Sequence, residues 1–272
     1  MKHHLCKDLA TNRSIKVLVV GAGGTGSQVI TALAQMNHAL RSLDHHGLDV
    51  TVVDDDTVSE ANVGRQWFFK SDIGQFKADV LVNRINMTLG TRWKASACKI
   101  SASHRVDDQI VIGCVDTRQA RYNIMRAMEE GCSGLSYWLD FGNRSHDGQV
   151  ILGQVSHARR KTNPDSKLPH VGELFPEIID PKIVDKDEGP SCSLAEALTK
   201  QSLFINRTLV SHGMAMLWEL LHTGVIEHHG VFVNLKTGKT NALDVDPKAW
   251  ERFGYGKAKK RIRIRKKQAE LA

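Results

Sequence analysis

The chain has 272 residues, of which 41% are hydrophobic and 25% charged, a balance typical of soluble globular proteins. No apolar run approaches the roughly 20 residues that a membrane-spanning helix needs, and the N-terminus lacks the apolar segment of a secretory signal. The composition therefore argues against a membrane or secreted protein, and we expect a cytoplasmic one.

The net charge of +7 is concentrated at one end of the chain. Residues 256–272 hold eight Lys and Arg and one acidic residue, so residues 1–255 carry 29 basic and 29 acidic side chains. A terminal block of like charge is usually solvated, and this basic tail is interpreted so first. The alternatives are an arm for an acidic partner or nucleic acid, because Lys and Arg neutralise phosphates, and an edge strand at 261–265.

Apolar periodicity predicts alternating strands and helices in the first half of the chain. The glycines that follow the first strand and the acids that end the second mark where these strands stop. The expected elements, in chain order, are strand 16–20, helix 27–40, strand 48–54, a helix within 72–90, strand 109–115 and helix 120–130. Such alternation predicts an α/β fold with a doubly wound, mostly parallel, Rossmann-like sheet.

The second half of the chain predicts an antiparallel extension of this sheet. Residues 136–155 form one expected hairpin, with a turn at 146–148, and residues 230–245 form another. Five of the six prolines fall in the polar stretch that precedes a helix expected at 193–221. We expect one domain at 1–255, divided into a core at 15–155, a long functional or mobile loop at 156–192 and a C-terminal helix and hairpin at 193–255.

A glycine-rich turn joins the first predicted strand to the first predicted helix. Gly21, Gly23, Gly24 and Gly26 allow a tight turn and close backbone approach, and the helix start offers free N–H groups to phosphates. Asp54, at the end of the second strand, is placed to bind a ribose diol. The motif predicts a nucleotide site, but an NAD-dependent dehydrogenase would show the same features. The alternative without function is a tight junction that binds no ligand.

Polar residues beyond the second strand distinguish a site for ATP from a site for NAD. This segment contains Asp56, Asn62, Arg65 and Gln66, and Lys77 follows in the next block. Arg offers paired donors and Lys a point charge, and both suit the charge that builds on a phosphate attacked by a carboxylate. Taken singly, Arg65 and Lys77 could form surface ion pairs. As a spaced set they favour phosphate chemistry, because hydride transfer has no use for them.

These blocks resemble the ThiF/MoeB/HesA family, the adenylation domains related to ubiquitin-activating E1 enzymes. The pattern D-x-D-x-V-x-x-x-N-x-x-R-Q at 54–66, followed by D-x-G-x-x-K-A at 72–78, carries the resemblance together with the glycine turn. Residues 111–121, V-I-G-C-V-D-T-R-Q-A-R, are similar to the family's strand that ends in a magnesium-holding Asp, and residues 148–150 match its hairpin. The resemblance covers 15–155 closely and the remainder loosely.

The resemblance implies an E1-like fold and an enzyme that uses ATP and Mg²⁺. Members adenylate the C-terminal carboxylate of a small β-grasp protein and release pyrophosphate, and no general base is required because a carboxylate is already a nucleophile. Catalysis would fall to Arg65, Lys77 and Asp116, with Asp116 on the metal. The implied nucleotide-binding residues are Gly21, Gly23, Gly24, Gly26, Asp54, Asp56, Asn62, Arg65, Gln66, Lys77 and Asp116.

The five cysteines include no Cys-x-x-Cys pair, so we expect neither a zinc site nor a disulfide framework. Cys192 ends the long loop and precedes a predicted helix, whose dipole would stabilise its thiolate. This position resembles the catalytic cysteine of compact E1 enzymes, which accepts the acyl group as a thioester. The alternative is a small buried cap residue. We expect Cys98, Cys114 and Cys132 to lie in the core.

The chain departs from the family in lacking the zinc-binding cysteines of many members and an upstream arginine that reaches the neighbouring subunit's site. Only Arg13 precedes the glycine turn, and it is too close to it. We expect a homodimer, but the missing arginine argues against shared active sites. The short chain and the Pro-Ser-Cys-Ser segment resemble the ThiF-type proteins of bacterial PRTRC cassettes, which implies a β-grasp partner encoded nearby.

The sequence thus favours ATP-dependent adenylation of a ubiquitin-like or sulfur-carrier protein, and the resemblance to compact E1 enzymes implies transfer of the acyl group to Cys192. One rival is a dehydrogenase, and another is a relative that activates an RNA-borne or small-molecule carboxylate. A third is a ThiF-like protein that binds nucleotide without catalysis. The complete set of Asn62, Arg65, Lys77 and Asp116 speaks against the third.

Overall fold

A computed structural model describes residues 1–6, 9, 13–131, 134–157, 167–185 and 201–255. The predicted basic tail and Cys192 lie outside these residues. Within them, no helix combines the length and the apolar character needed to cross a membrane.

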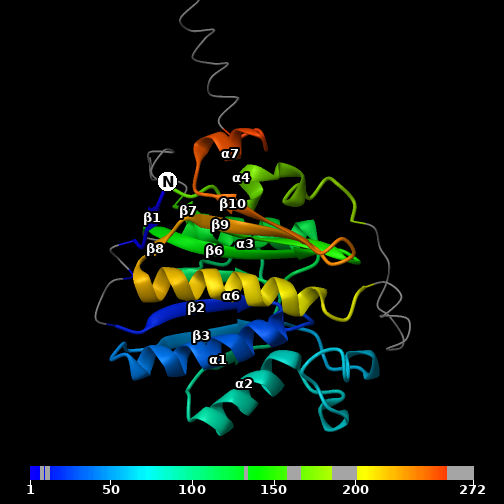
Figure 1. Cartoon of the computed structure of the whole chain (residues 1–272). Coiled ribbons are helices and arrows are strands. Elements are labelled where there is room, and N and C mark those ends of the chain that lie inside the picture. Colours follow the sequence, from blue (N-terminus) through cyan, green and yellow to red (C-terminus); the bar gives the residue numbers. More distant parts are fainter. Residues whose placement is uncertain (7–8, 10–12, 132–133, 158–166, 186–200, 256–272) are drawn as a thin grey trace, which may run out of the picture.

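A single eight-stranded sheet dominates the described chain, in the order β10-β9-β7-β6-β5-β2-β3-β4 (Figure 1). Its parallel half confirms the predicted alternation of strands and helices, and adds the short edge strand β4, which the sequence did not indicate. The elements of this half are β2 (Ile15–Val20), α1 (Gly26–Ser42), β3 (Leu48–Val53), α2 (Lys77–Leu89), β4 (Lys94–Ser96), β5 (Ile110–Gly113), α3 (Arg118–Gly131) and β6 (Leu135–Asn143).

The antiparallel half also follows the prediction. Strands β6 and β7 form the expected hairpin, β7 pairs with β9, and β9 and β10 form the second hairpin. A separate two-stranded sheet joins the N-terminus to the segment after α6. The elements here are β7 (Asp147–Ser156), α6 (Ile205–Thr223), β8 (Val225–Ile226), β9 (His228–Asn234), β10 (Lys239–Asp244) and α7 (Pro247–Glu251), with β1 at His3–His4.

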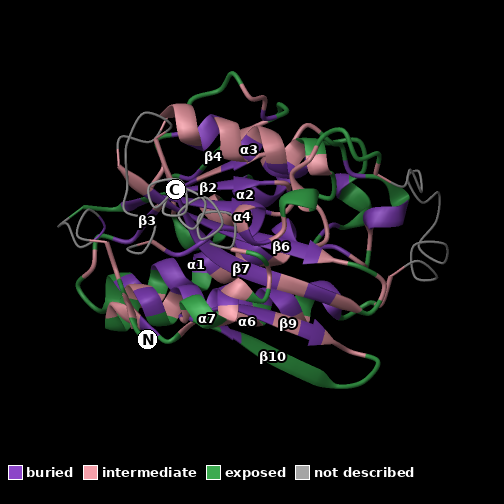
Figure 2. Ribbon diagram, turned by 90° about the horizontal axis from the view of Figure 1, so that it is seen from above, coloured by how far each residue is buried: buried purple, intermediate pink, exposed green. Residues whose placement is uncertain are grey.

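Helices cover both faces of the sheet, as a doubly wound fold requires. Helices α1 and α6 lie on one face and α3 on the other (Figures 1 and 2). The central strand β5 is buried along its whole length, which explains its continuous apolar run. Gly213 lets α6 approach the sheet, because a Cβ there would come within 2.6 Å of the ring of Phe141.

Two predicted segments differ from the structure. Residues 201–204 are not helical, although the helix was expected to start at 193. The N–H of Ser202 donates to the carbonyl of Ser145 at 2.8 Å, which draws this segment to the β6–β7 turn, and α6 begins only at Ile205. Residues 193–200 lie outside the described chain.

The stretch predicted as a long loop at 156–192 contains structure in its described part. Short helices α4 (Val171–Leu174) and η5 (Pro176–Ile178) form there, because Leu168, Val171 and Leu174 bury their side chains in the core. Three apolar side chains among polar neighbours were too weak a signal to predict a helix.

The packing of α6 on the sheet yields a stability prediction. Leu209 is fully buried on the sheet-facing side of α6, so Leu209→Ala leaves a cavity and should lower the free energy of unfolding by about 2–5 kcal/mol. Urea denaturation measures the loss. The exposed neighbour Arg207→Ala should change stability by no more than about 0.5 kcal/mol. Equal effects of the two substitutions would contradict the packing described here.

Candidate functional site

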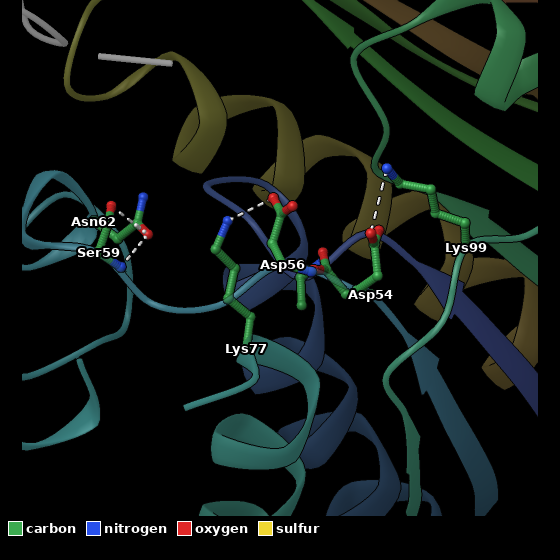
Figure 3. Close-up of polar contacts among 8 residues, drawn as sticks. Asp54, Asp56, Ser59, Asn62, Lys77 and Lys99 are labelled. Carbon is green, nitrogen blue, oxygen red and sulfur yellow. Dashed lines mark hydrogen bonds and ion pairs between the residues drawn. The ribbon is translucent and has the colours of Figure 1, made fainter. Parts of the chain in front are cut away.

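Three parallel strands end side by side at one edge of the sheet. Val20 at the end of β2 pairs with Val53 on β3 and with Gly113 on β5, so the loops that follow these strands leave the sheet together. Ligands of open α/β sheets bind at such carboxyl edges. Figure 3 shows the polar side chains that gather there.

The four glycines of the turn have different roles. Gly21 has φ of +96°, and a Cβ on it would lie 2.6 Å from the carbonyl oxygen of Cys114. A Cβ on Gly26 would overlap the carbonyl of Gly21, and one on Gly24 would lie 2.6 Å from the side chain of Asn206. Only at Gly23 is the space open. Backbone contacts therefore require glycine at Gly21 and Gly26, as a tight turn does, whereas the side chain of Asn206 limits the space at Gly24.

The start of α1 suits an anion. Its first turn contains no acidic residue, and no side chain caps its N-terminus. The free N–H groups of this turn give the N-terminus of α1 a partial positive charge, and the open space at Gly23 leaves room for an anion there.

Asp54 holds the glycine turn in place. One carboxylate oxygen accepts from the N–H of Ala22 at 2.5 Å and the other from the N–H of Asp56 at 2.8 Å (Figure 3). Burial raises the pKa of Asp54, while these two hydrogen bonds and the nearby charge of Lys77 act in the opposite direction. The residue predicted to bind ribose thus also connects β3 to the turn after β2.

Lys77 points back toward the loop after β3. Its ammonium lies 2.9 Å from a carboxylate oxygen of Asp56, and its backbone N–H donates to the carbonyl of Asp56 at 2.9 Å (Figure 3). The side chain of Lys77 is 9% exposed and that of Asp56 is 65% exposed. Lys77 therefore forms an ion pair, as the simpler alternative predicts, but its own side chain is largely buried.

The loop that contains Asn62 carries polar groups of two kinds. The side-chain oxygen of Asn62 accepts from the N–H and hydroxyl of Ser59 at 2.9 and 3.1 Å, which caps the short helix η2 (Glu60–Asn62) (Figure 3). In contrast, Nε of Arg65 and Oε1 of Gln66 are buried without a hydrogen-bond partner within the described structure. An unpaired buried polar atom costs about 1–3 kcal/mol, so both atoms fit a ligand that supplies partners.

The loop after β5 brings Asp116 to the same edge. The Cys114 thiol is close enough to Asp140, Asp116 and Asp54 for their charges to act on it. Burial, aided by these charges, raises the pKa of Cys114 well above its usual value, so the thiol is neutral and unreactive. This agrees with the predicted core role of Cys114.

A buried ion pair behind this loop was missed by sequence reasoning. Arg121 donates through Nε to both oxygens of Asp140, at 3.2 and 3.1 Å, and through its terminal nitrogens to the carbonyls of Asp116 and Phe141. Asp140 is completely buried, and burial raises its pKa to about 6 against the opposing effect of Arg121. A single charge inside an apolar strand was the signal that could have found it.

A second missed residue joins α6 to the glycine turn. The buried side chain of Asn206 accepts hydrogen bonds from Thr25 and Asn143 and donates to Gln201. No sequence motif marks it, because its partners are far apart in the chain. The start of α6 is thereby part of the site's supporting structure.

Two predictions about cysteines and metal ligands need comment. Cys98 was expected in the core, but it is exposed. It follows the short edge strand β4, at the point where the chain leaves the sheet. Among the described residues no group of three His, Cys, Asp or Glu could hold a metal ion. Asp116 is exposed, so a magnesium ion here would need phosphate oxygens and water as its other ligands.

The Arg121–Asp140 pair yields a prediction with a pH dependence. Arg121→Met leaves the Asp140 carboxylate buried and unpaired, which should destabilise the fold by about 3–5 kcal/mol near pH 8. A carboxyl with a raised folded-state pKa binds more protons folded than unfolded, so stability recovers as the pH falls through that pKa. Chemical denaturation at pH 8 and pH 5 should show the smaller loss at pH 5.

The matched control is Arg126→Met on the same helix. Arg126 forms partly exposed ion pairs with Glu129 and Glu130, and its loss should cost no more than about 1 kcal/mol. A loss in Arg121→Met that is equal at both pH values would contradict the assignment.

Comparison with known proteins agrees with this geometry. The chain is 33% identical over 111 residues to the NEDD8-activating enzyme E1 catalytic subunit of Dictyostelium discoideum, which covers 39% of this chain and 23% of that protein. It is 32% identical over 117 residues to the adenylyltransferase and sulfurtransferase UBA4 of Yarrowia lipolytica, covering 41% and 27%. The chain therefore matches only about a quarter of the length of these relatives.

Solved structures share the fold. Selenomethionine PaaA superposes with a TM-score of 0.57 and 13% identity, over 85% of this chain and 73% of its own. Escherichia coli MccB with ATP gives a TM-score of 0.55 and 13% identity, over 87% and 65%. Residues 6–249 match the ThiF family, which spans the whole sheet, and the chain belongs to the ThiF family.

Proposed function

We propose that this protein uses ATP to adenylate a carboxylate, that of the C-terminus of a ubiquitin-like or sulfur-carrier protein. The observation that carries the proposal is the Nε–H of Arg65, a buried donor without a hydrogen-bond partner within the described residues, in the loop that precedes the buried ammonium of Lys77. A cationic donor without a partner fits a polyphosphate, whose oxygens accept hydrogen bonds. The named activities of relatives such as UBA4 support the same reaction class.

The proposal gives each group at this edge of the sheet a binding role. The phosphates would lie over Gly23 and the first turn of α1, where a side chain is absent and N–H groups are available. The ribose hydroxyls would bind Asp54, whose oxygens each accept one backbone N–H and have a further lone pair to offer. Gln66 and Asp56 would also bind the nucleotide, as the resemblance implies, through its hydrogen-bond donors.

The chemical step needs charge stabilisation rather than proton transfer. A carboxylate oxygen of the substrate forms a bond to the α-phosphorus, the bond from that phosphorus to its bridging oxygen breaks, and pyrophosphate leaves with the electron pair. Arg65, Lys77 and Asn62 would stabilise the negative charge that develops on the phosphate oxygens. Magnesium, held through Asp116, would neutralise phosphate charge. Arg121 fixes the backbone of Asp116 from behind.

Two rival functions would use this site differently. A dehydrogenase would leave Lys77 and Arg65 without a task, whereas activation of an RNA-borne or small-molecule carboxylate would use the same site. Thioester transfer to Cys192, a homodimer, a neighbouring β-grasp partner of the PRTRC type and a role for residues 256–272 are predictions from sequence. The single-domain boundary at residue 255 is another.

ATP–pyrophosphate exchange tests the proposal directly. The protein is incubated with ATP, Mg²⁺, labelled pyrophosphate and a panel of ubiquitin-like and sulfur-carrier proteins with free C-termini. Label should enter ATP only when a cognate carrier is present. Absence of exchange with every carrier, combined with binding of NAD, would sink the proposal in favour of the dehydrogenase.

Lys77→Met should reduce the exchange rate by about 10²–10³-fold, because it removes a preorganised charge from the transition state. Methionine keeps the buried volume, so the thermal midpoint should stay close to that of the unchanged protein. Lys70→Met, at an exposed lysine of the neighbouring helix η3 (Lys70–Asp72), serves as the charge-matched control and should leave exchange unaltered. A normal rate in Lys77→Met would remove this lysine from the site.

Gly23→Ala and Gly26→Ala should separate binding from folding. A methyl group at Gly23 has room in the protein but occupies the proposed phosphate position, so ATP affinity should fall at least about tenfold with unchanged stability. A methyl group at Gly26 overlaps the carbonyl of Gly21, so stability itself should fall. Calorimetric titration and thermal melts measure both quantities. Full ATP affinity in Gly23→Ala would place the phosphates elsewhere.

Cys192→Ala tests the thioester prediction separately. A reducible adduct between carrier and enzyme should vanish in this variant, while pyrophosphate exchange persists because adenylation precedes transfer. An adduct that survives the substitution, detected on non-reducing gels, would exclude Cys192 from the mechanism.

A further inference from the structure

Residues 176–185 return to the start of α3 and are held there by one arginine. The backbone N–H of Arg118 donates to a carboxylate oxygen of Asp185 at 2.9 Å, and the guanidinium forms an ion pair with the other oxygen. Nε of Arg118 donates to the carbonyl of Glu177 at 2.9 Å. One residue therefore connects both ends of this segment to the helix that follows Asp116.

The Asp185 end of the segment has little else to hold it. Within the described structure, the other hydrogen bonds of residues 180–185 are local, from the N–H groups of Lys182 and Ile183 to Asp180. Ile183 is exposed and Val184 is 88% exposed, so no apolar packing anchors them. The Arg118–Asp185 contact thus decides where this end of the segment lies.

The contact has the chemistry of a carboxylate-binding subsite. It combines a guanidinium with the first backbone N–H of a helix of 14 residues, and both favour an anion. Arg118 stands two residues after Asp116 in the chain, and Arg121 of the same helix bonds to the Asp116 backbone. The Asp185 carboxylate is therefore bound at the start of the helix that follows Asp116, the residue proposed to hold magnesium.

We propose that Arg118 and the N-terminus of α3 receive the carboxylate of the incoming acyl substrate, and that Asp185 occupies this subsite as an internal competitor in the substrate-free protein. The inference rests on the proposed function, because it assigns the substrate's reacting group to this position. Asp185 leaves when the substrate carboxylate enters, and residues 176–185 are then released from Arg118. Substrate binding and movement of this segment are in this way one event.

The strength of the contact suits a competitor that must be displaced. The side chains of Arg118 and Asp185 are each about one-third exposed, so solvent weakens their attraction. An ion pair of this kind changes an equilibrium by only about three- to fivefold. A substrate carboxylate can therefore replace Asp185 at Arg118 through its own binding energy alone.

Binding of a carboxylate peptide tests the subsite without any catalysis. The probe is a hexapeptide ending in Gly-Gly with a free C-terminus, and the same peptide with a C-terminal amide is its control. Calorimetric titration of the full-length protein should show about three- to fivefold tighter binding of the free acid in Asp185→Asn than in the unchanged protein. The amide should bind both proteins equally.

Two further variants make the result specific to this contact. Asp180→Asn removes a carboxylate from the same segment that does not touch Arg118, and it should leave binding of the free acid unaltered. Arg118→Gln should bind acid and amide alike. Hydrogen exchange should show faster exchange at residues 176–185 in Asp185→Asn and in Arg118→Gln, but not in Asp180→Asn.

The outcomes are separable from those of the proposed function. Equal binding of the free acid by Asp185→Asn and the unchanged protein, including no binding by either, overturns the subsite. Failure of pyrophosphate exchange with every carrier, while the Asp185→Asn gain persists, leaves a carboxylate subsite but removes adenylation. Normal exchange with no gain in Asp185→Asn supports adenylation and removes the competitor.

Discussion

The close approach of Gly26 to the carbonyl of Gly21 is the constraint on which the rest of the site depends. It lets α1 begin directly against the end of β2, because no side chain separates the helix from the turn. The N–H of Gly21 donates to Val53 at 2.9 Å, and Asp54 accepts from Ala22, so the end of β3 is held to the same turn. This junction therefore sets the position of the N–H groups that are proposed to contact phosphate.

Two buried cationic side chains near the junction are fixed by ion pairs. Lys77 is buried against Asp56 on the side of β3, and Arg121 is buried against Asp140 on the side of β5. Groups fixed in this way need little reorganisation when a charged ligand arrives, which is the main source of electrostatic catalysis. The unpaired atoms of Arg65 and Gln66 differ from these pairs, because they are buried but have no hydrogen-bond partner within the described residues.

The same arrangement gives the two faces of the sheet different tasks. Helix α1 brings N–H groups from one face, and α3 on the other face brings Arg118 and Arg121 (Figure 2). Helix α6 reaches the glycine turn through Asn206, which places the C-terminal half of the chain in contact with that turn. A movement of residues 201–206 would therefore shift the side chain of Asn206 against Gly24.

Much of the fold could be predicted because local patterns specify it. The strand, glycine turn and helix at 16–40 and the hairpin around residues 146–148 each contain their own signals, and both formed as expected. Asn206 and the start of α6 could not be predicted, because they depend on contacts with Thr25 and Ser145 that only the folded chain creates.

The candidate site follows the same division. The residues Asp54 and Lys77 could be found from spacing, since a family motif records it, but their bonds to Ala22 and Asp56 could not. Asp140 was visible as a charge in an apolar strand, yet its role depends on Arg121, which reaches it from a helix. Sequence patterns thus indicate the candidate binding groups better than the residues that support them.

We infer that this site joins a carboxylate to the α-phosphate of ATP. A carrier protein with ¹⁸O in its C-terminal carboxylate, turned over with ATP and an acceptor thiol or amine, tests it most directly. Adenylation predicts AMP that contains one ¹⁸O atom, measured by mass spectrometry, and unlabelled pyrophosphate. Formation of ADP with ¹⁸O in inorganic phosphate would show attack at the γ-phosphate and contradict the account.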